Sequence, residues 1–455
     1  MFPGVFPDLP GVRCDQFQHL ISESGQVEAQ HLFLSHCHSD HMRGLDNIDK
    51  VLAADPHTKL YCSMISSSFV LTQFQDKIQP QHVIELGINV PVDITVKHET
   101  GDYQLRVTAV DAGHCPGSVM FLIERMREES QVERRILYTG DFRHDDRSRP
   151  LATIRALHDE ERNPVKLDKL YLDTTFFTDQ YKSFPARRDT ELHIWQLVKD
   201  WVGRNKKRGS RKKHVVLLHL PDPYGYEKIM MMIYNKSGGD WRVHVDNNKF
   251  NTYLCHDILS DSTDCDNTGD AQYVHACHKQ SVPANLENCG NYLPCSPGAK
   301  NLSVLHIQPS AMFFTSEKLE SEGLSVKVEA ANKSRDKDCE RYRVCFSTHS
   351  SYKEIEEFIR YFPADEVIPC VTPPGVDQEE FNRLFSDFVK SLKSPDARSS
   401  EGSCDFDSQP LHSSVMKRKA DREQESPPPA KVGVGVVGLE HLQVPGNHQY
   451  CLLSQ

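Results

Sequence analysis

The sequence predicts a mixed α/β fold in which the ends of strands carry the chemically active residues. Between Phe33 and Tyr171, short runs rich in β-branched and aromatic residues alternate with turns, and polar residues collect where the runs end. Helical stretches intervene at SSSFVLTQFQDK and TELHIWQLVKDWVGRNKK, where apolar residues recur every three or four positions. A chain of 455 residues exceeds what one hydrophobic core usually organises, so we expect two domains and a less ordered segment.

Three blocks of elements follow one another along the chain. The strands predicted in the first block are HLFLSH, KLYCSMI, DITVKH, LRVTAVDAGH, GSVMFLIER, RRILYTGDF and KLYLDTTF. From about Leu170 to Ser310 the second block has the strand VVLLHL, the helix GYEKIMMMIYNK and the strands WRVHVD and QYVHAC. The third block, RYRVCFSTHSSYKEIEEFIRYF, is a strand followed by an amphipathic helix. After about Lys393 the periodicity stops and Ser, Asp, Glu and Pro dominate, which predicts a disordered tail over residues 394–455.

Composition narrows the class of protein. No run of about eighteen apolar residues occurs, and the opening MFPGVFPDLPGVRC lacks the features of a signal peptide, so we expect a soluble intracellular protein. Fourteen cysteines at irregular spacings favour reduced thiols and metal ligands over a disulfide framework. The net charge of -11 counts against a nucleic-acid partner, but only weakly, because a local basic track acts within a Debye length of about 10 Å.

The sequence HCHSDH at residues 36–41 is the strongest chemical signal in the chain. His36 and His38 are two positions apart, so in an extended segment both point to one side and can bind one metal. Asp40 and His41 then turn towards a neighbouring position. A polar loop that happens to hold three histidines is the alternative interpretation, and it loses weight if further ligand-type residues occur later in the chain.

Two further groups complete the predicted site. His114 in DAGHCPGS follows the strand LRVTAV, and Asp141 in YTGDFR follows the strand RRILYT. Alone, such a histidine is more often structural and such an aspartate more often a cap. Together with the first motif they predict a site for two divalent metals about 3.5 to 4 Å apart, bridged by a carboxylate.

The pattern HxHxDH followed by a later His and Asp resembles the metallo-β-lactamase superfamily. Asp173 in YLDTTF, the large block after it and His349 in CFSTHSSY resemble its β-CASP subgroup of nucleic-acid nucleases, and within it the DNA nucleases that open hairpins. The matching segments, which extend to about residue 372, are FLSHCHSDHMRGL, AGHCPGSVMFL, LYTGDFR, YLDTTF, YGYE, VHAC and CFSTHSSY. The resemblance implies an αββα sandwich from residues 1–165 and 316–393, with an inserted α/β β-CASP domain over residues 166–315.

The resemblance also implies individual roles. The resemblance implies that two active-site metals are held by His36, His38, Asp40, His41, His114 and Asp141. This donor set is compatible with zinc, manganese or magnesium. The implied catalytic residues are Asp40, Asp141, Asp173 and His349, the last close enough to assist the phosphate or the leaving oxygen. Val371 in VIPCVTPP stands where RNA-type members carry His, which favours DNA as the substrate.

The second block contains a further set of metal-ligand residue types. The set is His244 in RVHVD, His275 and Cys277 in VHACH, and Cys295 in LPCS. Two histidines and two cysteines can close a tetrahedral site, yet their spacing is wider than in a compact zinc finger and by itself favours ordinary buried side chains. The resemblance instead implies a structural zinc at these four positions. The nearby rival ligands are Cys265, His278 and Cys289.

Several basic residues are candidates for contact with DNA. Arg43 and Arg143 each stand directly behind a metal motif, and the loop KKRGSRKK includes Lys207, Arg208 and Lys212. A polyanion needs clustered cations, although a run of charge is as often a solvated surface.

The function implied by the resemblance is that of a metal-dependent endo- and exodeoxyribonuclease. Such an enzyme opens hairpins and trims overhangs, with 5′-3′ exonuclease activity, in double-strand-break repair by non-homologous end joining and in V(D)J-type recombination. The implied partners are DNA, the DNA-dependent protein kinase and the end-joining ligase complex. The implied compartment is the nucleus, and KRK at residues 417–419 resembles a localisation cluster. An RNA-processing nuclease of the same subgroup and a catalytically silent nucleic-acid-binding scaffold are the two rival hypotheses.

Overall fold

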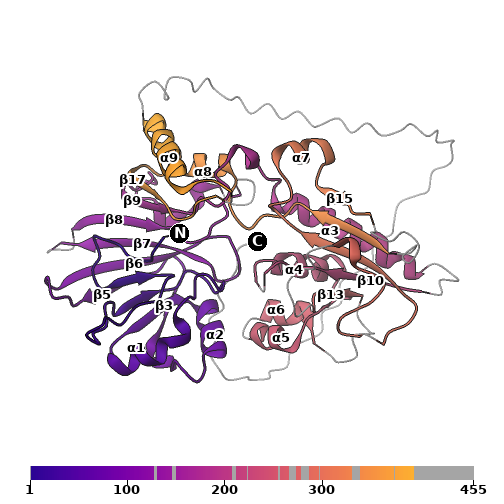
Figure 1. The fold of residues 1–455 in the computed structure, drawn as a ribbon, viewed down its shortest axis with the longest axis horizontal. Coiled ribbons are helices and arrows are strands. Elements are labelled where there is room, and N and C mark those ends of the chain that lie inside the picture. The colour runs from indigo at the N-terminus through magenta and orange to yellow at the C-terminus, as the bar shows by residue number, and fades with distance from the viewer. Residues whose placement is uncertain are drawn as a thin grey trace, which may run out of the picture. The chain divides into compact units, whose positions relative to one another are not determined.

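The first domain of the computed structural model consists of two sheets with helices on their outer faces (Figure 1). The structure describes residues 2–127, 131–145, 150–206, 212–222, 224–254, 257–265, 273–277, 286–296, 298–329, 339–373 and 375–393. The four-stranded sheet has the order β1 (Val12–Cys14), β2 (His31–Phe33), β3 (Lys59–Ser63), β4 (Val83–Leu86). The six-stranded sheet has the order β17 (Ala364–Pro369), β9 (Leu167–Leu172), β8 (Val132–Tyr138), β7 (Val119–Met126), β6 (Tyr103–Asp111), β5 (Pro91–Val96).

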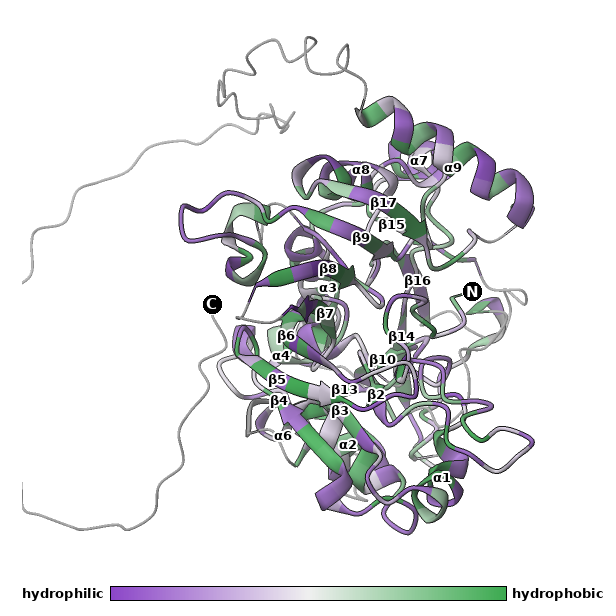
Figure 2. Cartoon of the chain, turned by 90° about the vertical axis from the view of Figure 1, so that its left-hand side faces the viewer, coloured by the Kyte–Doolittle hydropathy of each residue, from purple (hydrophilic) through white to green (hydrophobic). Residues whose placement is uncertain are grey.

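The alternation of side chains along each strand explains the layers. In β7, Phe121 and Ile123 face the core between the two sheets, whereas Met120 and Leu122 face the helices on the other side. Helices α8 (Tyr352–Tyr361) and α9 (Gln378–Lys393) pack on that side, and α9 alternates hydrophilic and hydrophobic patches along its length (Figure 2). Helices α1 (Ile48–Ala54) and α2 (Met64–Gln73) cover the outer face of the four-stranded sheet. The predicted αββα sandwich is therefore confirmed.

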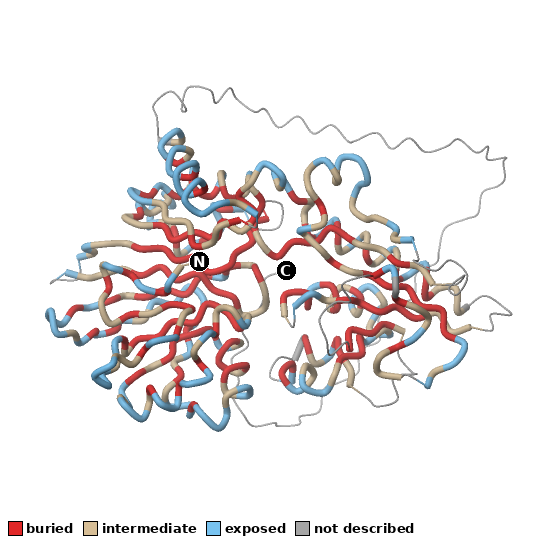
Figure 3. Tube along the Cα trace, viewed as in Figure 1, coloured by how far each residue is buried: buried red, intermediate tan, exposed pale blue. Residues whose placement is uncertain are grey.

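The second domain is built on a seven-stranded sheet that is parallel except at one edge. Its order is β12 (Thr263–Asp264), β11 (Val243–His244), β13 (Val274–His275), β10 (Lys213–Leu218), β14 (Leu302–Pro309), β16 (Glu340–Val344), β15 (Ser325–Lys327), and β15 alone is antiparallel to its neighbour. Its helices are α3 (Arg187–Val202), α4 (Glu227–Lys236), α5 (Asn247–Tyr253), α6 (Asp257–Ser262) and α7 (Ser316–Glu322). Buried residues concentrate in the central strands of both domains (Figure 3).

Short 3-10 helices complete the described elements. They are Leu45–Asn47, Pro80–His82, Leu151–Thr153, Arg155–Leu157, Asp179–Tyr181, Gly203–Lys206 and Leu286–Asn288. None of the helices that the structure describes has both the length and the apolar character to cross a bilayer.

Sheet membership divides the chain at different positions from the predicted boundaries of 166 and 316. Strand β9 pairs with β8 and β17 in the sandwich, and strands β15 and β16 belong to the sheet of the second domain. Both crossings between the domains thus lie further along the chain. The choice of sheet depends on partners distant in sequence, which local periodicity does not record. The predicted tail of 394–455, with its basic cluster at 417–419, lies outside the described residues.

Candidate metal centre

The predicted metal ligands converge at the ends of strands from both sheets of the sandwich. His36 and His38 follow β2, His114 follows β6 and Asp141 follows β8. One donor atom of each of these four residues lies within 4.8 Å of the donor atoms of the other three. His38, His114 and Asp141 line a pocket that Tyr224 of the second domain also lines, and His36 is buried beside them. The loops at the strand ends therefore meet in one place, as the sequence predicted.

The Asp141 carboxylate lies at the centre of this group. Its Oδ2 atom is 3.6 Å from His36 Nε2 and 3.7 Å from His114 Nε2, and its Oδ1 atom is 3.3 Å from His41 Nε2. The two oxygens thus face different histidines. Asp40 is more exposed and lies 3.8 Å from His41 Nε2, on the Oδ1 side. This geometry suits a carboxylate shared between two cations.

Hydrogen bonds fix which nitrogens of His38 and His114 face the pocket. His38 Nε2 lies 3.1 Å from the Tyr224 carbonyl oxygen, and His114 Nδ1 lies 2.8 Å from that of Thr348. A carbonyl can only accept a hydrogen bond, so these outer nitrogens carry the protons. The inner nitrogens, His38 Nδ1 and His114 Nε2, lie 3.1 Å apart, and in the neutral form of both rings their lone pairs point at each other. Two neutral imidazoles in this arrangement repel each other unless a cation lies beside both lone pairs.

His36 and His41 are held in a similar way by Asp15, a residue that the sequence did not single out. Ser35 donates its hydroxyl proton to Asp15 Oδ2 at 2.5 Å, so Ser35 Oγ accepts from His36 Nδ1 at 2.9 Å. His41 Nδ1 donates to the same Asp15 oxygen at 2.9 Å, and Tyr138 donates to it at 2.8 Å. His36 Nε2 is left buried, without a hydrogen-bond partner, and directed at Asp141. A buried nitrogen lone pair in this position fits a metal.

A fifth histidine, His349, adjoins the group together with Asp173. His349 Nδ1 donates to Asp173 Oδ2 at 2.8 Å, and its Nε2 atom lies 3.9 Å from Asp141 Oδ2. Asp173 also accepts from the backbone and the hydroxyl of Thr175 at 3.0 and 2.6 Å, which fixes the carboxylate. The sequence predicted both residues at the site, and the structure brings both there.

Burial and charge separate the protonation states of these groups. Burial, reinforced by neighbouring histidines, lowers the pKa of both His36 and His114, which keeps them neutral. Burial acts against the charged form of His349 too, but the Asp173 and Asp141 carboxylates outweigh it and raise its pKa to about 9. The pKa of Asp141 falls despite burial, because His41 and His349 stabilise the carboxylate. Neutral imidazoles around an ionised carboxylate form the donor set that divalent transition metals accept.

The basic residues predicted to contact DNA differ in burial and in their contacts. The Arg143 side chain is fully buried, forms an ion pair with Glu354 at 2.9 Å and donates to the carbonyl of His349 at 3.2 Å. The prediction that Arg143 contacts phosphate is therefore wrong, because its guanidinium braces helix α8 against the site. Arg43 is exposed and Lys212 half-buried, whereas Lys207 and Arg208 lie outside the described residues.

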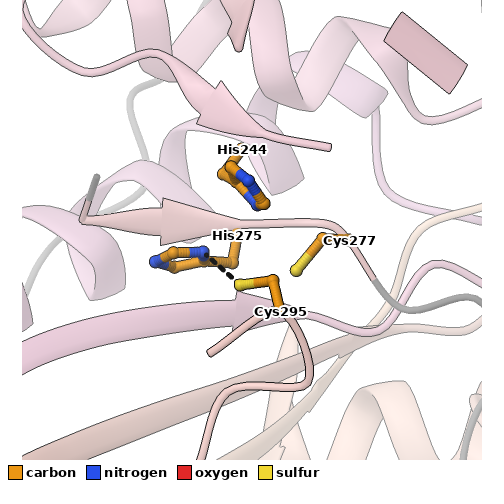
Figure 4. Close-up of side chains that lie close together, drawn as sticks. All are labelled: His244, His275, Cys277 and Cys295. Atoms are coloured by element: carbon orange, nitrogen blue, oxygen red, sulfur yellow. Dashed lines mark hydrogen bonds between the residues drawn. The ribbon is translucent and has the colours of Figure 1, made fainter. Parts of the chain in front are cut away.

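The second set of ligand types also converges, in the second domain. His244 and His275 end the adjacent strands β11 and β13, and the side chains of Cys277 and Cys295 lie beside them (Figure 4). His275 Nδ1 is 3.4 Å from Cys295 Sγ. A hydrogen bond from Cys277, with help from both histidines, lowers the pKa of Cys295 to about 3 and so favours a thiolate. These four side chains have the chemistry and the closed arrangement of a tetrahedral zinc site.

Of the three rival ligands, the two that the structure describes do not join this set. Cys289 lies instead with His219 and His306, whose rings are hydrogen-bonded at 2.8 Å. Cys265 joins none of the clusters of three or more ligand types formed by residues that the structure describes, and His278 lies outside those residues.

Comparisons with known proteins agree with this geometry. Residues 10–219 match the model of the beta-lactamase superfamily domain, and residues 267–375 match the model named DNA repair metallo-beta-lactamase. The chain is 31% identical to protein artemis of Danio rerio over 84% of its length and 55% of that protein, and 32% identical to protein artemis of Rattus norvegicus over 86% and 51%. It is also 30% identical to 5' exonuclease Apollo of Danio rerio over 44% of this chain and 30% of Apollo. The chain spans about half the length of the artemis proteins that it matches.

Proposed function

The chain belongs to the metallo-β-lactamase superfamily, in its DNA repair family, and on that premise we propose that it is a metal-dependent DNA nuclease. The observation that carries the proposal is the group around Asp141, in which His36, His38 and His114 turn their nitrogen lone pairs inwards. The fold implies divalent metal ions, and donor atoms of these histidines and of Asp141 lie within 4.8 Å of one another, as such ions require.

Two metal positions follow from the donor atoms. The first would be held by His36 Nε2, His38 Nδ1, His114 Nε2 and Asp141 Oδ2, and the second by His41 Nε2, Asp141 Oδ1 and Asp40. Zinc, manganese and magnesium all remain compatible with the active-site donors, whereas the cysteines of the second cluster favour a structural zinc there. When bound, a pair of divalent ions lowers the pKa of water to supply hydroxide and stabilises negative charge on a phosphodiester.

The remaining side chains have separate tasks in phosphodiester cleavage. His349, protonated below about pH 9, carries its second proton on Nε2 beside Asp141 and can donate it to a phosphate oxygen or to the leaving oxygen. Asp173 holds the His349 ring in that orientation. Asp15 holds His41 directly and His36 through Ser35. No covalent intermediate with the protein is required.

DNA is the proposed substrate. The relative named 5' exonuclease Apollo supports 5′-3′ exonuclease activity. The proposal also includes hairpin opening and overhang trimming, in double-strand-break repair by non-homologous end joining and in V(D)J-type recombination, as the sequence resemblance implies. Val371 lines the pocket, and the sequence resemblance implies that it stands where RNA-type members carry His. The proposal includes phosphate contacts by Arg43, Lys207, Arg208 and Lys212. It also includes a nuclear location and partnership with the DNA-dependent protein kinase and the end-joining ligase complex.

The test is cleavage of end-labelled hairpin DNA, overhang DNA and matched RNA by the purified protein. Wild type is compared with Asp40→Ala and with wild type freed of metal. Hairpin opening that disappears in both controls supports the proposal. Cleavage of RNA alone would assign the chain to RNA processing, and tight binding without cleavage would make it a scaffold.

A further inference from the structure

A short segment of the second domain, Tyr224–Glu227, reaches across to the metal centre of the sandwich. Its contact there is the Tyr224 carbonyl oxygen, which accepts a hydrogen bond from His38 Nε2 at 3.1 Å. The Tyr224 ring stacks on Phe69 of helix α2, with ring centroids 4.5 Å apart and an angle of 27° between the planes. The segment is thus anchored on the sandwich at the point where it meets a metal-binding histidine.

The peptide plane between Tyr224 and Gly225 is held from both of its edges. On one edge the carbonyl faces His38, and on the other the Gly225 N–H donates to Glu227 Oε2 at 2.7 Å. The Glu227 side chain is buried, and its second oxygen accepts from the Tyr253 hydroxyl at 2.6 Å. A buried carboxylate therefore sets the direction in which the carbonyl points.

Gly225 makes this arrangement possible. Its φ angle is +110°, a conformation that residues with a side chain rarely adopt. Relaxing that angle would rotate the same peptide plane and turn the carbonyl away from His38. Gly225 therefore determines the direction of the hydrogen bond between the Tyr224 carbonyl and His38, in addition to the path of the backbone.

We propose that the second domain is a working part of the metal centre, because the Tyr224 carbonyl holds His38 in the tautomer and orientation that direct Nδ1 at the metal. Tyr224 and Gly225 are thus positioning residues for metal binding. The inference rests on the proposed metal site. It has a reciprocal consequence: the free energy that docking of Tyr224–Glu227 on helix α2 adds to metal binding is also the free energy that metal binding adds to the docking.

The decisive variant is Gly225→Ala in the full chain, with Gly238→Ala as the matched control. Gly238 also has a positive φ, +77°, in the second domain, but an added Cβ there meets nothing within 4 Å. Mn²⁺, which a cysteine-containing cluster disfavours, is titrated calorimetrically. We expect Gly225→Ala to raise the Kd for Mn²⁺ by about 10- to 100-fold, the usual effect of losing a partner of a metal-binding histidine. Equal Kd values for the two alanine variants would overturn the inference.

A pair of variants at Tyr224 tests whether the stacked ring anchors the segment that carries the carbonyl. Tyr224→Phe keeps the stack on Phe69 and should bind Mn²⁺ as wild type does, whereas Tyr224→Ala should weaken binding. The pair also decides the question if Gly225→Ala does not fold. Equal affinities in the two Tyr224 variants would contradict the proposal.

The ¹⁵N signals of the His38 ring in metal-free protein provide a second readout. We expect the tautomer protonated at Nε2 in wild type and in Gly238→Ala, and its loss in Gly225→Ala. This measurement involves neither metal nor cleavage, so an inactive wild type would refute the nuclease while leaving the positioning role intact. An unchanged tautomer in Gly225→Ala would refute the positioning role alone.

Discussion

The two clusters of metal ligands in this chain differ in their donors and in their access to solvent. Around Asp141 the donors are imidazoles and carboxylates at a pocket, and Asp40 at its edge has a side chain 45% exposed. In the second domain two cysteines and two histidines surround one position, and three of the four residues are buried. An open site leaves room for water and substrate, whereas a closed tetrahedral site serves the fold.

The two clusters also differ in the charge state that their surroundings favour. The carboxylates near the first cluster hold the pKa of His41 above its usual range in spite of burial, so protons and metals compete for that site. In the second cluster the thiolate of Cys295 is stabilised by hydrogen bonds from Cys277 and the histidines. The comparison sharpens the proposal to two separate roles for metal, chemistry in one domain and stability in the other, which mutations can distinguish.

The largest expected effect is the loss of cleavage in Asp141→Asn. The substitution keeps the size of the side chain but removes the charge shared between both proposed metals, worth several kcal/mol, so the cleavage rate should fall by at least about 1000-fold. Melting temperatures measured alongside should change little. Asp102→Asn, at an exposed carboxylate, is the control, and an Asp141→Asn enzyme within tenfold of it would remove Asp141 from the chemistry.

The opposite pattern is expected for Cys277→Ser. Loss of one ligand should remove one equivalent of zinc per chain and lower the melting temperature by at least about 5 °C, because a structural metal adds its binding free energy to folding. The cleavage rate per folded molecule should remain within about twofold of wild type. Metal analysis and thermal melts of Cys277→Ser and of the control Cys265→Ser test this, and matching melts would deny the cluster a structural role.

The pH dependence of cleavage should show whether His349 acts as the proton donor. Burial opposes its charge, yet the Asp173 carboxylate raises its pKa to about 9, so the imidazolium is present below that pH and lost above it. If the imidazolium donates a proton, the rate should fall about tenfold for each pH unit above the pKa. Asp173→Asn should move this fall to lower pH, whereas Asp179→Asn, at an exposed carboxylate, should not. A profile unaffected by Asp173→Asn would exclude His349 as the acid.

Sequence reasoning succeeded where local pattern determines geometry. The two-residue spacing of His36 and His38 and the placement of His114 and Asp141 after strands were enough to predict that these side chains meet. It missed Asp15, which reaches His41 only because β1 pairs with β2. That contact depends on tertiary pairing, to which an acidic residue after a short strand gives only a weak clue.

The predicted phosphate contact of Arg143 was wrong for the same physical reason. Its position behind Asp141 indicated a phosphate contact, but its partner Glu354 belongs to a helix more than two hundred residues further along the chain. An arginine beside a metal motif can serve either the substrate or the fold, and its ion-pair partner decides which.

The smallest expected effect concerns Arg43, which is exposed beside the HCHSDH motif. Arg43→Glu should raise the KM for hairpin DNA several-fold and reduce the dependence of log K on log salt by about one unit, as expected when one phosphate contact is lost. Lys390→Glu, on the exposed face of helix α9, is the charge-matched control. Because one phosphate contact contributes little to the chemical step, kcat should stay nearly constant. A parallel loss of kcat would instead indicate that Arg43 takes part in the chemical step at Asp141. An unchanged salt dependence would show that Arg43 does not contact a DNA phosphate.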